Sequence, residues 1–254
     1  MAQTTKDKFA VGGILDTIAP WVMLLGGLLI TVGFVLTFTT APLVNGAGVN
    51  EPAVIGGVVI ANKLLLSQKI FYWHVPVAVA SAVALVLMAY FSVRFLMTRK
   101  HEYDMRANIA MELSLVFVLC TMVSGTFWER FEWGVWWTWE PRLTTYFILM
   151  MLVFGYFILR NAIDDPERRG VYCAVFGILS FVDMPISFVV TRLVPSSLHP
   201  VVFRTDSGLS PDMLLPFLLS MFGMCMVLYG LYRLRLRTQL IQERVDAIQE
   251  TLED

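Results

Sequence analysis

A dense cluster of tryptophans is the most informative feature of the sequence. Four tryptophans fall within residues 133–139, and a fifth stands just before them. A belt of tryptophans at a membrane surface accounts for one or two rings per helix end. Rigid aromatic rings offer a broad apolar surface at low entropic cost, so the cluster predicts a platform for a flat aromatic ligand. A simple membrane anchor is the alternative. The predicted platform consists of Trp128, Trp133, Gly134, Trp136, Trp137 and Trp139, and it ends at Glu140 and Arg142.

The three histidines of the chain are unevenly placed around this cluster. His74 and His199 stand beside apolar runs and are expected on the same side of a membrane as the tryptophans. His101 follows two basic residues and is expected to be solvated. Neither outer histidine has a cysteine or an acidic cluster beside it to suggest zinc. Two histidines that flank an aromatic platform fit axial ligation of haem iron. The residues alone leave open that each histidine only forms hydrogen bonds at a helix end.

Several other chemistries lack their motifs. The three cysteines lie in apolar runs and form neither a C-x-x-C nor a C-x-x-C-H pattern, which excludes thioredoxin-like chemistry and covalent haem attachment to this chain. There is no G-x-x-x-x-G-K-[ST] motif, so any use of ATP is expected to come from a partner. A net charge of -1 gives no bulk electrostatic case for nucleic acid.

The composition predicts the elements that position these residues. Hydrophobic residues make up 57% of the 254-residue chain and charged residues only 15%, against about 25% charged in soluble domains. A spanning helix needs roughly 20 apolar residues. We therefore predict an all-α, polytopic integral membrane protein: one transmembrane domain over 1–254, with six helices and outer loops that form a haem-presenting surface. The expected spans are 20–39, 75–97, 109–127, 143–159, 171–190 and 213–232, with a Trp-rich loop at 128–142 and a tail at 233–254.

The distribution of basic residues predicts the orientation. Thirteen of the 19 Lys and Arg residues fall on the side of the two termini and of the connections after the second and fourth spans. The basic side of a membrane protein is normally cytoplasmic. We expect both termini in the cytoplasm, with the Trp-rich loop and both outer histidines on the periplasmic side of a bacterial inner membrane. The charged residues within 1–17 (Lys6, Asp7, Lys8 and Asp16) and the long apolar run that follows argue against a cleavable signal peptide.

Two acidic residues lie within the expected spans. Charges at bilayer depth are costly and are often functional. For Asp183 the alternative is that it satisfies backbone groups freed by Pro185. For Glu112 the alternative is simple solvation near the inner interface. The sequence assigns neither a role.

The tryptophan motif and its surroundings resemble a known family. Residues 124–128 (SGTFW), 133–140 (WGVWWTWE) and 142–145 (RLTT) resemble the tryptophan-rich signature of the haem-handling proteins of cytochrome c biogenesis. The Arg-Leu-Thr form, together with KIFYWHVP at 69–76 and DMPISF at 183–188, is similar to the haem exporter protein C (CcmC) family. The resemblance covers roughly residues 15–235. This chain has Glu140-Pro141 where that family usually has Asp-Ala; a proline here is closer to the related cytochrome c synthetases.

The resemblance implies a function and partners. It implies that His74 and His199 are axial ligands of a non-covalently bound haem b, which the Trp-rich loop presents. Arg142, at the end of that loop, is expected to pair with a haem propionate. It also implies covalent transfer to a periplasmic haem chaperone, within an assembly that contains an ABC-type ATPase, membrane subunits and a small single-span subunit. No independent catalytic residue is expected in this chain.

Three other classes stay open at this point. A component of a cytochrome c synthetase, or haem lyase, is one alternative, although those enzymes tend to have more spans or a large outer domain. A transporter is disfavoured because the spans show few charges and no pairs of half-helices broken by glycine. The third is a membrane anchor or structural subunit without its own haem site.

Overall fold

The chain forms a bundle of six long helices. The computed structural model describes residues 13–42, 53–55, 58–60, 67–194 and 209–253. The helices are α1 (Ile14–Thr39), α3 (Phe71–Thr98), α4 (His101–Trp133), α5 (Pro141–Ala162), α6 (Pro166–Leu193) and α7 (Pro211–Glu253). A short 3-10 turn, η1 (Gln68–Ile70), leads into α3. All six are long and apolar enough to cross a membrane, which confirms the predicted all-α class and number of spans.

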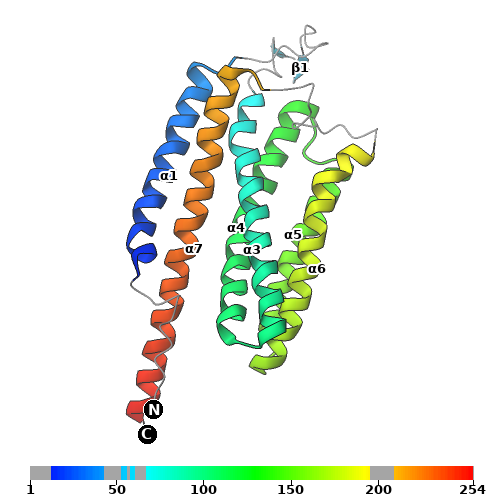
Figure 1. Cartoon of the computed structure of the whole chain (residues 1–254). Helices are drawn as coiled ribbons and strands as arrows, with labels where there is room; N and C mark the ends of the chain where they lie inside the picture. The colour runs from blue at the N-terminus through cyan, green and yellow to red at the C-terminus, as the bar shows by residue number, and fades with distance from the viewer. Residues whose placement is uncertain (1–12, 43–52, 56–57, 61–66, 195–208, 254) are drawn as a thin grey trace.

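Two short strands are the departure from the predicted all-helical chain. Strands β1 (Ala53–Ile55) and β2 (Val58–Ile60) pair antiparallel, with Val54 opposite Val59. They lie between α1 and η1, where an outer loop was expected. The strands sit beyond the end of the helices, so they leave the helical bundle unchanged (Figure 1).

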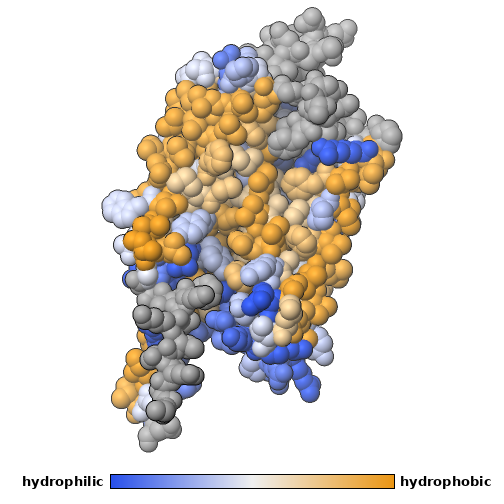
Figure 2. All heavy atoms as spheres, in the orientation of Figure 1, coloured by the Kyte–Doolittle hydropathy of each residue, from blue (hydrophilic) through white to orange (hydrophobic). Residues whose placement is uncertain are grey.

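The helices are arranged as neighbours in space (Figure 1). Helix α1 lies along α7, and α3 lies among α4, α6 and α7. The start of α1 and the end of α7 lie at one end of the bundle, whereas the α4–α5 connection and the start of α3 lie at the other. We call the latter the outer end. Figure 2 shows an apolar surface over most of the length of the bundle, with hydrophilic residues gathered near the opposite end.

Small residues allow α1 and α7 to approach closely. A Cβ atom added to Gly26 would lie 2.7 Å from the carbonyl oxygen of Gly223, and one added to Gly223 would lie 2.7 Å from that of Gly26. Between apolar helices in lipid, such close backbone contact takes the place of the hydrophobic effect as the source of attraction. The adjacent Gly27 faces open space, so the requirement is specific to one face of α1.

Ion pairs join the helices toward the end that carries the termini. The guanidinium of Arg160 on α5 donates two hydrogen bonds to Asp104 on α4, at 3.0 and 2.8 Å. Arg235 on α7 likewise donates two to Glu112 on α4, at 2.8 and 3.1 Å. Glu112 therefore forms an ion pair between helices, and the alternative that it is simply solvated near the inner interface is wrong. Its partner is 123 residues away along the chain.

A lysine closes the outer end of α1. The Nζ atom of Lys69 in η1 donates to the carbonyl oxygens of Thr37 and Ala41, each at 2.7 Å. The last carbonyls of a helix have no partner within it, so a lysine amine is a suitable donor for them. This contact ties the segment that enters α3 to the end of α1.

Candidate functional site

The Trp-rich loop is shorter than the expected 128–142 because α4 continues through Trp133. Gly134 ends the helix with φ of +77°, a left-handed conformation that glycine adopts without steric cost. The side chain of Arg130 donates to the Gly134 carbonyl oxygen and fixes the turn. Residues 134–140 therefore form the loop, whereas Trp128 and Trp133 are helical.

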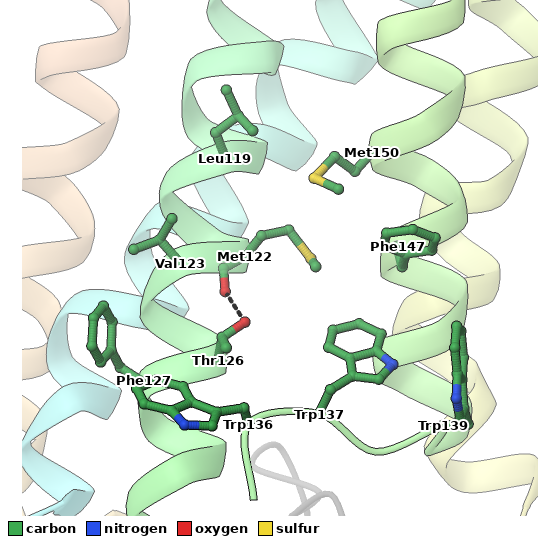
Figure 3. A pocket seen from close by; sticks show the side chains of 10 residues that line it. All are labelled: Leu119, Met122, Val123, Thr126, Phe127, Trp136, Trp137, Trp139, Phe147 and Met150. Carbon is green, nitrogen blue, oxygen red and sulfur yellow. Dashed lines mark hydrogen bonds between the residues drawn. The ribbon is translucent and has the colours of Figure 1, made fainter.

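Three loop tryptophans line an open apolar groove between α4 and α5 (Figure 3). Its volume is about 590 Å³, within the range of about 300–1,000 Å³ typical of small-molecule sites. Trp137 packs edge-on against Trp139 and Phe147, each with its ring centroid 5.7 Å away. Trp139 remains 73% exposed. The groove is lined by Leu119, Met122, Val123, Thr126, Phe127, Trp136, Trp137, Trp139, Phe147 and Met150.

Trp136 is held at the other end of the groove. Its ring lies edge-on to Phe127, with centroids 5.8 Å apart, and the guanidinium of Arg130 lies 5.6 Å from its centroid. The same arginine thus fixes both the turn at Gly134 and the orientation of Trp136. Trp136 is nevertheless 56% exposed.

His74 sits in a clamp formed by α4. Its Nδ1 atom lies 2.9 Å from the hydroxyl of Ser124. A Cβ atom at Gly125 would lie 3.0 Å from His74 Cε1, a tight contact, so glycine at this position lets the ring lie close to α4. Trp128 stands edge-on to the imidazole at 5.6 Å, and its Nε1–H donates to Glu132 at 3.1 Å. The ring of His74 is therefore held on three sides at the outer end of the bundle.

The clamp and the groove occupy opposite sides of α4. Ser124 and Trp128 are one helical turn apart on the side that faces α3, whereas Met122 and Thr126 face the groove. The structure thus groups Trp128 with His74, and groups Trp136, Trp137 and Trp139 with one another. Such a division is invisible in the sequence, where all five tryptophans lie within twelve residues.

Glu140 and Arg142 begin α5. The Glu140 carboxylate accepts hydrogen bonds from the backbone N–H groups of Arg142 and Leu143, at 2.9 and 3.2 Å, and Pro141 occupies the first helical position. Carboxylates are good N-caps, and proline is favoured at this first position. The guanidinium of Arg142 lies 5.3 Å from the Phe188 ring centroid on α6, and its positive charge acts on His74.

The remaining sequence candidates are placed as follows. His101 pairs with Glu243 at 3.2 Å and is largely exposed, far from the tryptophans at the opposite end of α4. His199 lies outside the described residues. Asp183 forms no hydrogen bond to the backbone near Pro185 in the described part of the chain, and its Oδ2 atom is buried without a partner there. No cluster of three metal-binding side chains occurs among the residues that the structure describes.

Comparison with known proteins decides the family. A family model described as "Heme exporter protein C" matches residues 60–251. The chain belongs to the haem exporter protein C family. It is 28% identical over 194 residues to the protein of that name from Rhodobacter capsulatus, covering 75% of this chain and 80% of the relative. It is 25% identical over 222 residues to the one from Escherichia coli K12, covering 87% and 83%.

Haem exporter protein C is a family name that fits the donor set at the outer end. An imidazole, an indole and a guanidinium lie there, and groups of these kinds can bind an iron, a flat macrocycle and a carboxylate. Sequence reasoning missed the roles of Ser124 and Gly125, although both stand in the SGTFW segment that carried the resemblance. A small hydroxyl residue followed by glycine, inside an apolar span, was the available signal.

Proposed function

We propose that this protein binds haem b at the periplasmic face of the bacterial inner membrane and presents it for covalent transfer to a haem chaperone. The observation that carries the proposal is the clamped His74 ring beside Trp128, at the end of the bundle that also holds the Trp-rich loop. Membership of the haem exporter protein C family indicates a role in haem handling for cytochrome c maturation. The geometry supports a role as a holder rather than a catalyst.

Each part of the site has a task in this proposal. His74 and His199 supply the two axial nitrogens to the iron, one on each face. Arg142 pairs with a propionate, where a charge-assisted bond to a carboxylate is strong. Trp128, Trp133, Trp136, Trp137, Trp139 and Gly134 shape the aromatic surface. Glu140 contributes by fixing the start of α5, which carries Arg142.

The orientation and the partners belong to the same proposal. The basic residues at the end opposite the loop favour cytoplasmic termini. The relatives are named haem exporter protein C, which favours an assembly of several subunits. The proposed partners are further membrane subunits, an ABC-type ATPase and a small single-span subunit. This chain would supply the haem-holding part.

Haem content of the purified protein tests the proposal. Protein from haem-replete cells, in detergent, should contain haem b that acidified organic solvent extracts completely, as pyridine haemochrome analysis measures. Folded protein without a Soret band, both as isolated and after addition of haem, would reject a haem site. It would leave the anchor or structural role.

A further inference from the structure

We infer that Ser124 is a positioning residue that holds His74 in the tautomer protonated on Nδ1, so that Nε2 is the ring nitrogen left free as a ligand. The inference concerns the protein alone. It rests on the proposed function only for what Nε2 then binds. The geometry that carries it joins three atoms: His74 Nδ1, Ser124 Oγ and the Cys120 carbonyl oxygen.

The single proton of the Ser124 hydroxyl is already committed. Its Oγ donates to the carbonyl oxygen of Cys120 at 2.8 Å, with the carbonyl of Thr121 at 3.2 Å as a second acceptor. A hydroxyl has one hydrogen and two lone pairs. The contact of 2.9 Å with His74 therefore has Oγ as the acceptor and Nδ1–H as the donor. A neutral imidazole carries one proton, so Nε2 keeps its lone pair.

The opposite arrangement is disfavoured by what surrounds the ring. If Ser124 turned its hydrogen toward Nδ1, Nε2 would carry the proton and require an acceptor. In the described part of the chain, the only hydrogen bond of His74 is the one at Nδ1.

The clamp also restricts rotation of the ring. The close approach of Gly125 to Cε1 and the edge of Trp128 confine the imidazole. Trp128 is itself tied to Glu132. Second-shell hydrogen bonds of this kind fix the tautomer of a metal-binding histidine and raise its donor strength.

Nitrogen NMR of the protein without haem tests the tautomer directly. The chain has three histidines, so protein labelled with ¹⁵N-histidine gives few side-chain signals, and a His74→Ala variant identifies those of His74. The neutral His74 ring should show a protonated, pyrrole-type Nδ1 and a pyridine-type Nε2. A pyridine-type Nδ1 with a protonated Nε2 in the wild-type protein overturns the inference.

Variants separate Ser124 from general packing effects. Ser124→Ala should move His74 toward the Nε2–H tautomer or a mixture, while Ser124→Thr should preserve the Nδ1–H form because it keeps a hydroxyl. Ser180→Ala is the matched control: Ser180 on α6 makes the same kind of bond to the Phe176 carbonyl, at 3.0 Å. A His74 tautomer unchanged in Ser124→Ala, or altered equally in Ser180→Ala, contradicts the assignment. The wild-type spectrum decides even if Ser124→Ala fails to fold.

The haem-loaded protein gives a second readout. Loss of the Nδ1–H acceptor weakens the donor strength of the imidazole, so Ser124→Ala should raise the midpoint potential of the haem, and Ser124→Thr should restore it. Failure of the two ideas is distinguishable. Protein that binds no haem but shows the Nδ1–H tautomer rejects the proposed function alone, whereas haem-binding protein with an Nε2–H ring rejects this inference alone.

Discussion

The carboxylate of Glu140 caps the helix that carries Arg142, accepting the backbone N–H of that residue at 2.9 Å. Glu140 is buried, and the two backbone N–H groups that it accepts give its side chain a structural task at the edge of the candidate site. The guanidinium of Arg142 lies 5.3 Å from the Phe188 ring centroid on α6, and its charge acts on His74. The position of that charge depends on the cap.

Replacing Glu140 should therefore act first on stability. Glu140→Ala should lower stability by about 1 kcal/mol, the usual cost of losing an N-cap, and should weaken haem retention as α5 frays. Glu140→Asp should retain both properties, because aspartate is also a good N-cap. Thermal unfolding in detergent, followed beside haem content, measures the two. A Glu140→Ala protein of normal stability that cannot transfer haem would instead place the carboxylate against the ligand or a partner.

A side chain at Gly125 should press on the ring of His74. A methyl group there meets His74 Cε1 at 3.0 Å, so Gly125→Ala should displace the ring and weaken haem retention by about tenfold, as second-shell changes at metal sites do. Gly27→Ala is the control, because a Cβ at Gly27 meets nothing within 4 Å. Soret absorbance per protein at matched expression compares them. Equal retention by both variants would mean that the ring position is not critical.

The loop tryptophans should behave as a binding surface rather than an anchor. Each aromatic contact is worth about 0.5–1.5 kcal/mol beyond burial, so Trp136→Ala, Trp137→Ala and Trp139→Ala should each lower haem retention or transfer about two- to tenfold. Protein level and membrane insertion should stay normal, and double variants should be worse than single ones. Haem occupancy and covalent haem on the acceptor, measured side by side, show the effect. Wild-type values throughout would make the loop an anchor.

Trp128 should stand apart from those three in the kind of effect it has. Because its ring touches His74, Trp128→Ala should alter the Soret and α bands of the bound haem, whereas the groove variants should change occupancy with little change in band position. Absorption spectra normalised to haem content make this comparison. Identical band shifts in all four variants would contradict the division into a clamp and a groove.

The sequence predicted the parts of this molecule that depend on local composition. Long apolar runs determined the six spans, and the excess of tryptophan identified the outer loop. The sequence could not reveal that Trp128 and Trp136 lie on different sides of α4, because their positions depend on where the helix ends at Gly134. Nor could it pair Glu112 with Arg235, since long-range contacts depend on how the helices pack.

The sequence also contains a signal for the N-cap role of Glu140, which the sequence analysis does not assign. An acidic residue followed by proline, just before an apolar run, is the pattern of an N-cap and first helical position. In the sequence analysis, Glu140 and Pro141 stand only as a departure from the family pattern. The contact between Ser124 and His74 joins residues 50 positions apart, and it emerges only when α3 is packed against α4.

Haem retention by single histidine variants is the most direct measurement of the proposed function. His74→Ala, His101→Ala and His199→Ala would be purified from haem-replete cells at matched protein level and compared by pyridine haemochrome and by absorption spectra with and without added imidazole. His74→Ala and His199→Ala should lose most of their haem or their low-spin spectrum, imidazole should partly restore it, and His101→Ala should match the wild type. Loss of haem in His101→Ala, with full retention in His74→Ala, would contradict a haem site at the outer end of the bundle.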